Sequence, residues 1–299
     1  MKRTTWLWLA ILSLGCGGRY ISRSSDYKET RWVMGTYVNL VIVDAGEASP
    51  QAAARAAFEA IEQWDRILNN YDETTPLSRI NAAAPEWTEV PELLCWYLTR
   101  ARDDSRRTDG AFDLTAGGGV VGMEKVELDC QGLRARLPAR GMLLDPGGDG
   151  KGVALDAAIA VLRANGVKSA LFDFGGSSWS GIGKPRNATA WRVRVDGVEE
   201  DSFVNVFLND RALSVSSARR RREDGSAGAP HIVDPTTGEL VQERRVTAAV
   251  SESAIDAEVL STALIVRGAV GFGWLERFEG IEAWILEADG EILSAVSPE

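Results

Sequence analysis

The stretch "GGDGKGVALDAAIAVLRANGVKSALFDFGGSSWSGIG", residues 147–183, decides the fold prediction. Its glycine-rich start opens an apolar segment that predicts a helix, and Asn165-Gly166 marks the end of that helix. The apolar run "SALFDF" then predicts a strand, and Gly175-Gly176 supplies a turn after it. A helix that leads directly into a strand indicates a fold that mixes both kinds of element.

The rest of the chain extends this pattern in both directions. Helices are predicted over residues 49–70, 90–110 and 254–268, with a loop and a short helix over 71–83. Strands are predicted over residues 31–44, 191–197, 202–210, 212–217 and 244–253, with a strand-rich insert over 124–144 and a closing hairpin over 281–296. Because the helices are segregated between antiparallel strands, we expect an α+β fold in one compact unit.

Composition excludes several classes of function. The chain has 299 residues, an apolar content of 45% and a formal net charge of −10. An acidic chain gains nothing from the electrostatics of a polyanion, so we expect no nucleic-acid partner. One histidine and three cysteines are too few for most zinc and iron sites. Any bound metal should therefore be a hard, oxygen-liganded ion such as Mg²⁺ or Ca²⁺.

Residues 1–16 are predicted to be a bacterial lipoprotein signal peptide. The charged "MKR" precedes the apolar run "WLWLAILSLG", which is too short to span a bilayer as an ordinary transmembrane helix. Cys16 would then be lipidated, so that the protein is exported and anchored to a membrane of the cell envelope, facing the periplasm. Ordinary cleavage near Gly17 and Gly18 is the alternative.

Residues 17–30 are polar and are predicted to form a flexible tether, and residues 31–299 are predicted to form one folded domain. The two other cysteines of the exported chain, Cys95 and Cys130, could pair. However, "ELLCWYL" predicts a buried helix. We therefore expect Cys95 to pack as a small hydrophobic residue.

Three segments suggest chemistry from their residues alone. In residues 145–156, "DPGGDGKGVALD", a glycine-rich turn opens a helix beside Lys151, which would suit a phosphate, although a plain tight turn is the alternative. Glu258 and Thr262 lie four residues apart on a helix, so both could ligate Mg²⁺ together with a backbone carbonyl. His231 opens the sharp turn "HIVDPTTG", although a lone histidine is usually structural.

Taken in order, eight segments resemble the ApbE family, the FAD:protein FMN transferases, over roughly residues 30 to 290. These segments are "MGTYVNL", "YDETTPLSRIN", "GAFDLTAGG", "DPGGDGKGVALD", "FDFGGSSWSGIG", "SVSS", "HIVDPTTG" and "AIDAEVLSTAL". The resemblance implies a T-fold-like, antiparallel α+β catalytic domain. It also implies an exported or membrane-anchored enzyme that uses Mg²⁺ to cleave FAD at the pyrophosphate, releases AMP and leaves FMN on a Thr or Ser hydroxyl of an acceptor protein.

The resemblance also implies roles for individual residues. Contacts to FAD would come from Met34, Tyr71, Ala111, Phe112, Asp113, Asp145, Lys151 and Ile232. Within this set, Met34, Tyr71 and Ile232 would contact the flavin, and Asp113 would hold the adenine end. The carbonyl of Gly148 and the side chains of Glu258 and Thr262 would bind Mg²⁺.

His231 and Asp234 are the candidate catalytic residues. Phosphoryl transfer needs the negative charge of the pyrophosphate to be neutralised and an in-line nucleophile, and the acceptor protein would supply that nucleophile. Our hypothesis is that His231 and Asp234 shape a turn over the pyrophosphate. Asp234 or a nearby acid would then help to deprotonate the acceptor hydroxyl.

Three departures from the family pattern leave other functions open. Glu258 stands where the family has Asp, Val215 and Ser217 replace Thr and Gly, and the stretch between Asp113 and Asp145 is short. The longer Glu258 side chain predicts weaker Mg²⁺ binding or tolerance of Ca²⁺ or Mn²⁺. The alternatives are an FAD-binding lipoprotein or FAD pyrophosphatase with weakened or lost transfer, and a purely structural envelope lipoprotein.

Overall fold

The computed structural model describes residues 26–199, 201–221 and 227–298. The predicted signal peptide 1–16, the lipidation site Cys16 and most of the predicted tether 17–30 lie outside these residues. The tether prediction is wrong at its end, because the first strand, β1, already begins at Tyr27. Within the described ranges, no helix has both the length and the apolar character needed to cross a membrane.

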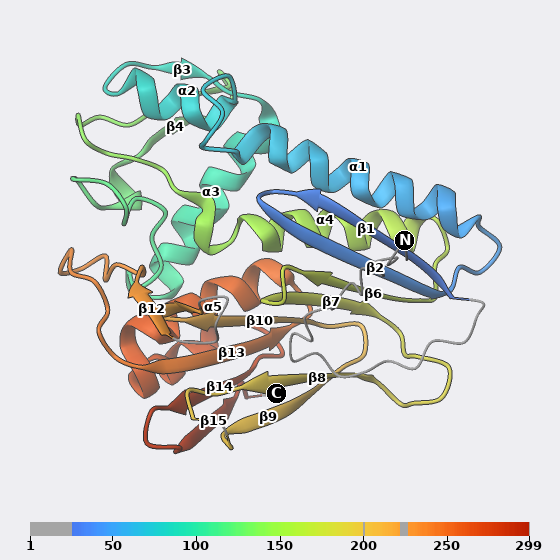
Figure 1. Cartoon of the computed structure of the whole chain (residues 1–299). Helices are drawn as coiled ribbons and strands as arrows, with labels where there is room; N and C mark the ends of the chain where they lie inside the picture. The colour runs from blue at the N-terminus through green and yellow to red at the C-terminus, as the bar shows by residue number, and fades with distance from the viewer. Residues whose placement is uncertain (1–25, 200, 222–226, 299) are drawn as a thin grey trace, which may run out of the picture.

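One antiparallel sheet of eight strands forms the centre of the fold (Figure 1). Its order is β1-β2-β6-β7-β10-β13-β14-β15. The strands are β1 (Tyr27–Val33), β2 (Thr36–Asp44), β6 (Ser169–Phe174), β7 (Ser178–Ile182), β10 (Ala212–Ser217), β13 (Arg245–Ser251), β14 (Glu282–Glu287) and β15 (Ile292–Val296). This sheet confirms the predicted α+β class with antiparallel strands.

The segment 31–44, which we predicted as a single strand, is a hairpin instead. Met34 and Gly35 separate β1 from β2, and both residues have positive φ values of 50° and 74°. A glycine adopts such a conformation readily, so the pair can turn the chain within two residues. Val33 then pairs with Thr36 across the turn.

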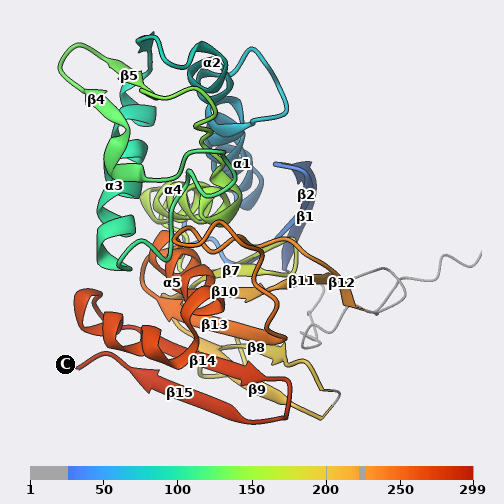
Figure 2. The ribbon, with the colours of Figure 1, turned by 90° about the vertical axis from the view of Figure 1, so that its left-hand side faces the viewer.

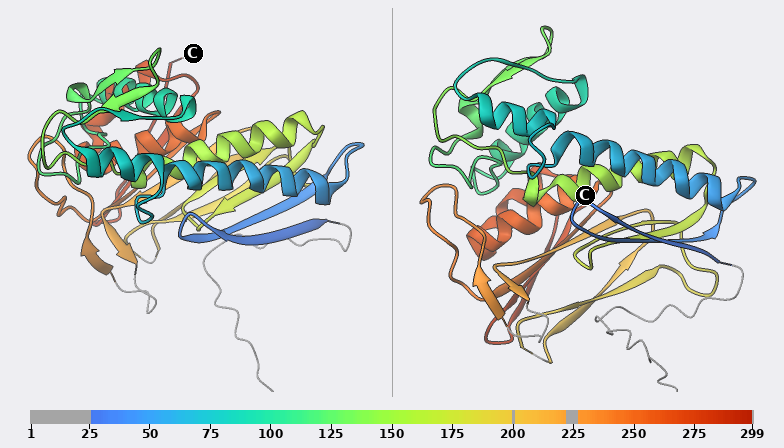
Figure 3. Two further views of the ribbon diagram at one scale, coloured as in Figure 1. Left: turned by 90° about the horizontal axis from the view of Figure 1, so that it is seen from above. Right: turned by 45° about the horizontal axis from the view of Figure 1, so that its top comes forward.

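Helices cover one face of the sheet (Figures 1 and 3). They are α1 (Pro50–Leu68), α4 (Gly150–Ala164) and α5 (Ala254–Arg267). Serine side chains cap the starts of α1 and α5, since Ser49 accepts a hydrogen bond from the N–H of Ala52 and Ser253 accepts one from the N–H of Asp256. The predicted helix 254–268 and the helix inside 147–166 are therefore confirmed.

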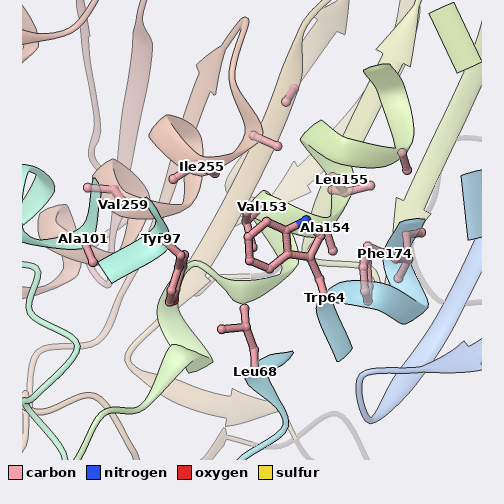
Figure 4. Packing of buried hydrophobic residues seen from close by; sticks show 14 of the residues in the cluster. Trp64, Leu68, Tyr97, Ala101, Val153, Ala154, Leu155, Phe174, Ile255 and Val259 are labelled. Atoms are coloured by element: carbon pink, nitrogen blue, oxygen red, sulfur yellow. The ribbon is translucent and has the colours of Figure 1, made fainter. Parts of the chain in front are cut away.

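The main core lies between these helices and the sheet. Figure 4 shows Trp64 of α1, Val153 of α4, Ile255 of α5 and Phe174 of β6 meeting in it. Gly152 lets α4 and α5 approach closely, because a Cβ at this position would lie 2.7 Å from the carbonyl oxygen of Ala254. A side chain at position 152 would therefore push the starts of the two helices apart.

A two-stranded ribbon, β8 (Trp191–Asp196) and β9 (Phe203–Leu208), covers part of the other face of the sheet (Figure 2). Alternating residues of β8, Trp191, Val193 and Val195, are buried against the sheet. This alternation follows the period of two that was used to predict the strand. The molecule thus has three layers: helices, main sheet and ribbon.

A smaller lobe stands at one end, farthest from the ribbon (Figure 2). It contains α2 (Pro76–Ala83), α3 (Glu92–Arg107) and a three-stranded sheet of β3 (Thr88–Glu89), β5 (Arg134–Arg136) and β4 (Glu127–Asp129). Cys95 on α3 and Cys130 after β4 form a disulfide. Our prediction that Cys95 merely packs as a small hydrophobic residue was therefore wrong. The bond ties the predicted insert 124–144 to α3.

The remaining elements are short. They are the 3-10 helices η1 (Met123–Lys125), η2 (Pro146–Gly148) and η3 (Gly268–Arg277), and the hairpin β11 (Arg219–Arg221) and β12 (Ala227–Pro230). Sequence patterns did not predict β11, β12 or η3. Of these elements, η2 and the β11–β12 hairpin matter most for the site, because each adjoins a loop with predicted chemistry.

Candidate active site

One cavity of about 1230 Å³ gathers most of the predicted site residues. It lies where β7 begins and β10 ends, beside the first turn of α4 and the middle of α5. The predicted residues that line it are Tyr71, Ala111, Phe112, Asp113, Asp145, Gly148, Lys151, His231, Ile232, Glu258 and Thr262. Residues from motifs that are far apart in the sequence therefore lie together at one cavity.

Two predicted residues do not line this cavity. Met34 is at the tip of the β1–β2 hairpin, where its side chain lies against Gly150 of the glycine-rich turn. Met34 can support the turn, but it does not line the cavity wall, where the predicted flavin contact would require it. Asp234 is the second exception. Tyr71, by contrast, lines the cavity with 93% of its surface exposed.

The glycine-rich turn is built around Asp145 and Lys151. Asp145 caps η2, because its Oδ1 accepts a hydrogen bond from the N–H of Gly147 at 2.9 Å. Gly148 packs against Phe112 so closely that a Cβ would lie 2.8 Å from the ring. Lys151 is the second residue of α4, and its ammonium adds positive charge to the positive end of that helix. An anion such as a phosphate fits this wall of the cavity.

The carboxylate of Glu258 is the most enclosed charge at the site. The residue is only 1% exposed. Its Oε1 accepts from the Ser178 hydroxyl at 2.5 Å and lies 3.2 Å from Nζ of Lys151. Its Oε2 accepts from the N–H of Gly152 at 2.7 Å. A buried carboxylate needs such donors, and these three leave only about one of its four lone-pair positions for another ligand.

Thr262 lies one helical turn beyond Glu258 and joins a group of hydroxyls. Its Oγ1 is 3.4 Å from the hydroxyl of Ser216, which is itself 2.9 Å from the hydroxyl of Ser261. Ser261 in turn lies 2.9 Å from the hydroxyl of Ser214. The wall next to Glu258 is therefore formed by neutral oxygen atoms.

The oxygen atoms of Glu258, Thr262 and the glycine-rich turn could hold one hard cation, although they include only one carboxylate. Within the described ranges, no group of three or more His, Cys, Asp or Glu side chains is placed to hold a metal ion. Mg²⁺ often takes only one or two carboxylates and completes its octahedron with water and substrate phosphates. Glu258, Thr262 and a carbonyl of the glycine-rich turn match that need. Lys151 competes for the same carboxylate.

Asp256, two residues before Glu258, does not assist. It does not line the cavity, and its Oδ1 accepts from Arg100 at 2.6 Å and from Arg107 at 2.9 Å. The acid therefore joins α5 to α3 and is not a substitute metal ligand.

His231 follows β12 directly and lines the cavity from an exposed loop. Its backbone N–H donates to the carbonyl of Ala218, and Val233 pairs with Leu240 to close the loop. The imidazole is the only one in the chain. Its position on the cavity wall makes His231 a candidate general base.

Asp234 is not placed to act as that base. Its Oδ1 accepts from the N–H and the hydroxyl of Thr236, and its Oδ2 accepts from Arg267 at 2.6 Å. Partial burial raises the pKa of Asp234, but these hydrogen bonds outweigh burial and hold the pKa below its usual value. A weakly basic carboxylate outside the cavity cannot take the acceptor's proton efficiently. The prediction that Asp234 shapes the turn agrees with these contacts, and its proposed role as a base does not.

Asp113 lines the cavity, but its carboxylate is engaged within its own loop. Oδ1 accepts from the N–H and hydroxyl of Thr115, and Oδ2 accepts from the N–H of Met123 at 2.8 Å. The acid thus fixes the loop that leads into the small lobe. Any contact to an adenine would use the lone pairs that these donors leave.

Several residues at the site escaped prediction. Ser178 and Ser216 lie in two segments that carry the family resemblance, but neither residue was given a role from the sequence. Asp149, directly before α4, is buried and accepts from the hydroxyl of Tyr97 at 2.5 Å. Burial raises the pKa of the Asp149 carboxyl well above its usual value. This pair joins α3 to the start of α4, a long-range contact that no local pattern indicates.

The sequence of this chain is similar to that of known proteins. The model of the ApbE family matches residues 34–285. A protein of Klebsiella pneumoniae (strain 342) named FAD:protein FMN transferase is 24% identical, over 86% of this chain and 83% of that protein. A protein of the same name from Rhodobacter capsulatus is 26% identical, over 98% of this chain but 61% of its own length.

Solved structures show the same fold. The apo form of the Pseudomonas stutzeri flavinyl transferase ApbE superposes with a TM-score of 0.76, at 23% identity, over 91% of this chain and 95% of that chain. The ApbE protein of Thermotoga maritima gives a TM-score of 0.76 at 24% identity, over 90% of this chain and 97% of that chain. With a family match that runs from the β1–β2 hairpin to β14, the chain belongs to the ApbE family.

Proposed function

We propose that this chain is an FAD:protein FMN transferase. The observation that carries the proposal is the single cavity in which Lys151, His231, Glu258 and Thr262 converge from three separate segments. Relatives that match most of this chain bear that name. A cationic turn at a helix start suits a pyrophosphate, and an exposed imidazole suits the deprotonation of a hydroxyl.

In the proposed reaction, the hydroxyl oxygen of an acceptor Ser or Thr attacks the phosphorus on the FMN side of the FAD pyrophosphate. The new oxygen–phosphorus bond forms as the bond to the bridging oxygen breaks, and AMP leaves with that oxygen. The hydroxyl proton passes to Nε2 or Nδ1 of His231. Lys151 and the start of α4 hold the charged phosphates in place.

The metal site proposed for this chain consists of Glu258, Thr262 and the carbonyl of Gly148. The support is the chemistry of the donor set: one buried carboxylate and neutral oxygens on one cavity wall. A bound Mg²⁺ would neutralise charge on the pyrophosphate. The ion pair between Lys151 and Glu258 favours weaker Mg²⁺ binding than a carboxylate without that partner would give.

We also propose that the protein works outside the cytoplasm, anchored through a lipid on Cys16. The Cys95–Cys130 disulfide supports export, because disulfides persist in oxidising compartments. The apolar run before Cys16 supports a signal peptide. Mass spectrometry of the membrane fraction from a bacterial host tests this, and an unmodified Cys16 in the mature protein would exclude the anchor.

The test of the proposed function is one incubation with FAD, Mg²⁺ and a small acceptor protein that carries exposed Ser and Thr residues. Acceptor mass and AMP are recorded together. We expect the acceptor to gain the mass of FMN less water, with an equal amount of AMP. AMP without a change in acceptor mass would instead indicate an FAD pyrophosphatase, and FAD binding without AMP would indicate a storage protein.

A matched substitution identifies the base. His231→Ala should lower transfer by about 10²- to 10⁴-fold, the usual contribution of a general base. His231→Gln keeps much of the side chain's shape and hydrogen bonding and should be equally impaired. If either variant retains full turnover, His231 is a turn residue, and the proposed proton acceptor is wrong.

A further inference from the structure

Helix α3 runs from the small lobe to the helix layer and contacts three segments that carry the site (Figure 2). The hydroxyl of Tyr97 donates to Oδ1 of Asp149, directly before α4, at 2.5 Å. The hydroxyl of Ser105 donates to Oδ2 of Asp113 on the cavity wall at 3.3 Å. Two arginines of α3 bind Asp256 of α5. The position of α3 therefore affects the glycine-rich turn, the Asp113 loop and α5 together.

The contact between Tyr97 and Asp149 is the one that reaches the glycine-rich turn. Tyr97 is fully buried, and Asp149 is almost fully buried. Within the described ranges, Oδ2 of Asp149 has no hydrogen-bond partner, and the carboxyl does not cap the N–H groups of α4. The Tyr97 hydroxyl is therefore the donor that the structure gives this buried carboxyl. Because leaving such a group unsatisfied is costly, the place of the turn depends on where α3 puts Tyr97.

The start of α3 has little else to fix it. Pro91 precedes the helix, and its side chain cannot accept a capping hydrogen bond. The small sheet beside it has strands of only two or three residues, which pair weakly by themselves. Cys95 is the fourth residue of α3 and is bonded to Cys130 in the turn after β4. The disulfide thus holds the first turn of α3, just before Tyr97.

This disulfide can be reached from one side, because Cys130 is exposed while Cys95 is buried. A thiolate of an external dithiol can therefore attack Sγ of Cys130. The bond between the two cysteine sulfurs breaks, and Sγ of Cys95 leaves as a thiolate and takes up a proton. The second thiol of the dithiol then displaces Cys130 as a thiol. The chain gains two electrons and two protons, and the dithiol becomes a disulfide.

We propose that the Cys95–Cys130 disulfide controls FAD binding by fixing, through α3 and Tyr97, the position of the glycine-rich turn. With the bond closed, the turn is held ready for the pyrophosphate. With the bond reduced, the first turn of α3 loosens, and the cavity binds FAD less tightly. This inference rests on the proposed transferase function and specifies its regulation. A chain in a reducing compartment would bind FAD weakly until it is exported and oxidised.

FAD and the disulfide should then favour each other. Coupling between two equilibria is reciprocal, so if reduction weakens FAD binding about tenfold, bound FAD makes the bond about tenfold harder to reduce. A cross-link that only stabilises the small lobe would raise the stability of the chain and produce neither effect. The two interpretations therefore differ in the affinity for FAD and not in the unfolding of the protein.

The first experiment measures the Kd for FAD by flavin fluorescence with the full chain, before and after reduction with dithiothreitol. We expect Kd to rise about tenfold on reduction and to return to its first value after reoxidation. The double variant Cys95→Ser/Cys130→Ser should show the higher Kd with and without dithiothreitol. That result would exclude an effect of the reductant on Cys16 or on FAD itself.

Two further measurements complete this experiment. In mixtures of reduced and oxidised dithiothreitol, saturating FAD should shift the reduction midpoint of the disulfide by about 30 mV, the equivalent of a tenfold change. Near-UV circular dichroism records whether the reduced chain keeps its packed core. An unchanged Kd on reduction would overturn the inference. Loss of the near-UV signal would also overturn it, because the bond would then maintain the whole fold and not the position of the turn.

Tyr97→Phe tests the route from the disulfide to the turn. It removes the hydroxyl and keeps the ring. We expect the oxidised variant to bind FAD about as weakly as the reduced wild type, and reduction to change its Kd by less than about twofold, because the two changes act on one contact. A full tenfold response to dithiothreitol in Tyr97→Phe would overturn the proposed route.

Tyr37→Phe is the matched control for the loss of a tyrosine hydroxyl. Tyr37 is exposed on β2 and does not line the cavity. This variant should bind FAD and respond to dithiothreitol as the wild type does. Equal behaviour of Tyr37→Phe and Tyr97→Phe would overturn the role given to Tyr97.

The two proposals fail differently. If the oxidised wild type binds no FAD, the transferase function itself is wrong, and the inference about its regulation falls with it. If the chain transfers FMN and binds FAD with the same Kd in both redox states, the function stands and only the control by the disulfide is wrong.

Discussion

Lys151 and Glu258 meet across the interface of α4 and α5, with Nζ of Lys151 3.2 Å from Oε1 of Glu258. The lysine is partly exposed to the cavity, and the glutamate is buried. The pair therefore links a cation that faces the cavity to a carboxylate in the interior. Because Gly152 and Ser178 also donate to Glu258, the carboxylate would keep two partners if Lys151 turned toward a bound anion.

Lys151→Met should remove the cation but keep most of the side chain's length. We expect transfer to fall by about 10²- to 10³-fold, because a preorganised charge at the pyrophosphate is lost. Stability should fall by only about 1 kcal/mol, since Gly152 and Ser178 still satisfy Glu258. Steady-state kinetics and urea unfolding measure the two effects separately. Full activity in Lys151→Met would remove Lys151 from the phosphate site.

Glu258→Asp should strengthen Mg²⁺ binding. The shorter side chain cannot reach both Gly152 and Ser178, so more of its lone pairs face the cavity. We expect a larger Mg²⁺-dependent rise in Tm than for the wild type, measured without FAD. Glu258→Gln, which keeps the length but not the charge, should show no Mg²⁺-dependent rise. Identical Mg²⁺ titrations for all three proteins would exclude Glu258 as a ligand.

The disulfide should contribute about 3–4 kcal/mol to stability, given the 35-residue separation of Cys95 and Cys130. The measurement is urea unfolding of the wild type with and without dithiothreitol, beside the double variant Cys95→Ser/Cys130→Ser. We expect the reduced wild type and the double variant to unfold at the same lower urea concentration. A reductant-insensitive wild type would contradict this expectation.

Asp234→Asn should lower stability in a pH-dependent way. Hydrogen bonds from Arg267 and Thr236 hold the folded-state pKa of Asp234 below its usual value. The contribution of the ion pair is therefore present above the unfolded-state pKa, about 3.9, and disappears as the pH falls through the lower folded-state pKa. We expect a loss of about 0.5–1 kcal/mol at pH 7, which vanishes toward pH 2–3.

The measurement for Asp234→Asn is urea unfolding between pH 2.5 and 7. The control is Asp289→Asn in the closing hairpin, an exposed acid without an ion-pair partner among the described residues. A constant difference between Asp234→Asn and the wild type at every pH would assign the effect to the turn backbone and not to the ion pair.

Much of the fold could be predicted because its signals are local. Ser49 and Pro50 mark the start of α1, and the apolar residues of β8 indicate a strand. The Met34-Gly35 turn was missed, because Met is not a usual turn residue and the flanking residues read as a continuous strand. The disulfide was missed because it depends on how β4 lies against α3, which no pattern in either segment specifies.

The site was predictable to a similar degree. Motif order placed Lys151, Glu258, Thr262 and His231 correctly on one cavity. It could not show that Glu258 would point to Gly152 and Ser178, since an extra methylene changes which atoms a carboxylate reaches. It also gave no sign of Trp179 at the cavity, because an apolar residue on a strand looks the same whether it lies in a core or lines a cavity.

The close contact between Gly152 and Ala254 has a consequence for how this enzyme could diversify. The glycine-rich turn and the carboxylate of Glu258 are carried by two helices whose starts lie so close together that a side chain at position 152 would push them apart. New substrate preferences would have to arise in the ribbon and the His231 loop, which carry residues that face solvent. Substitutions at the starts of α4 and α5 would therefore disturb the packing of the site, whereas substitutions in the ribbon and the His231 loop could change which substrates bind.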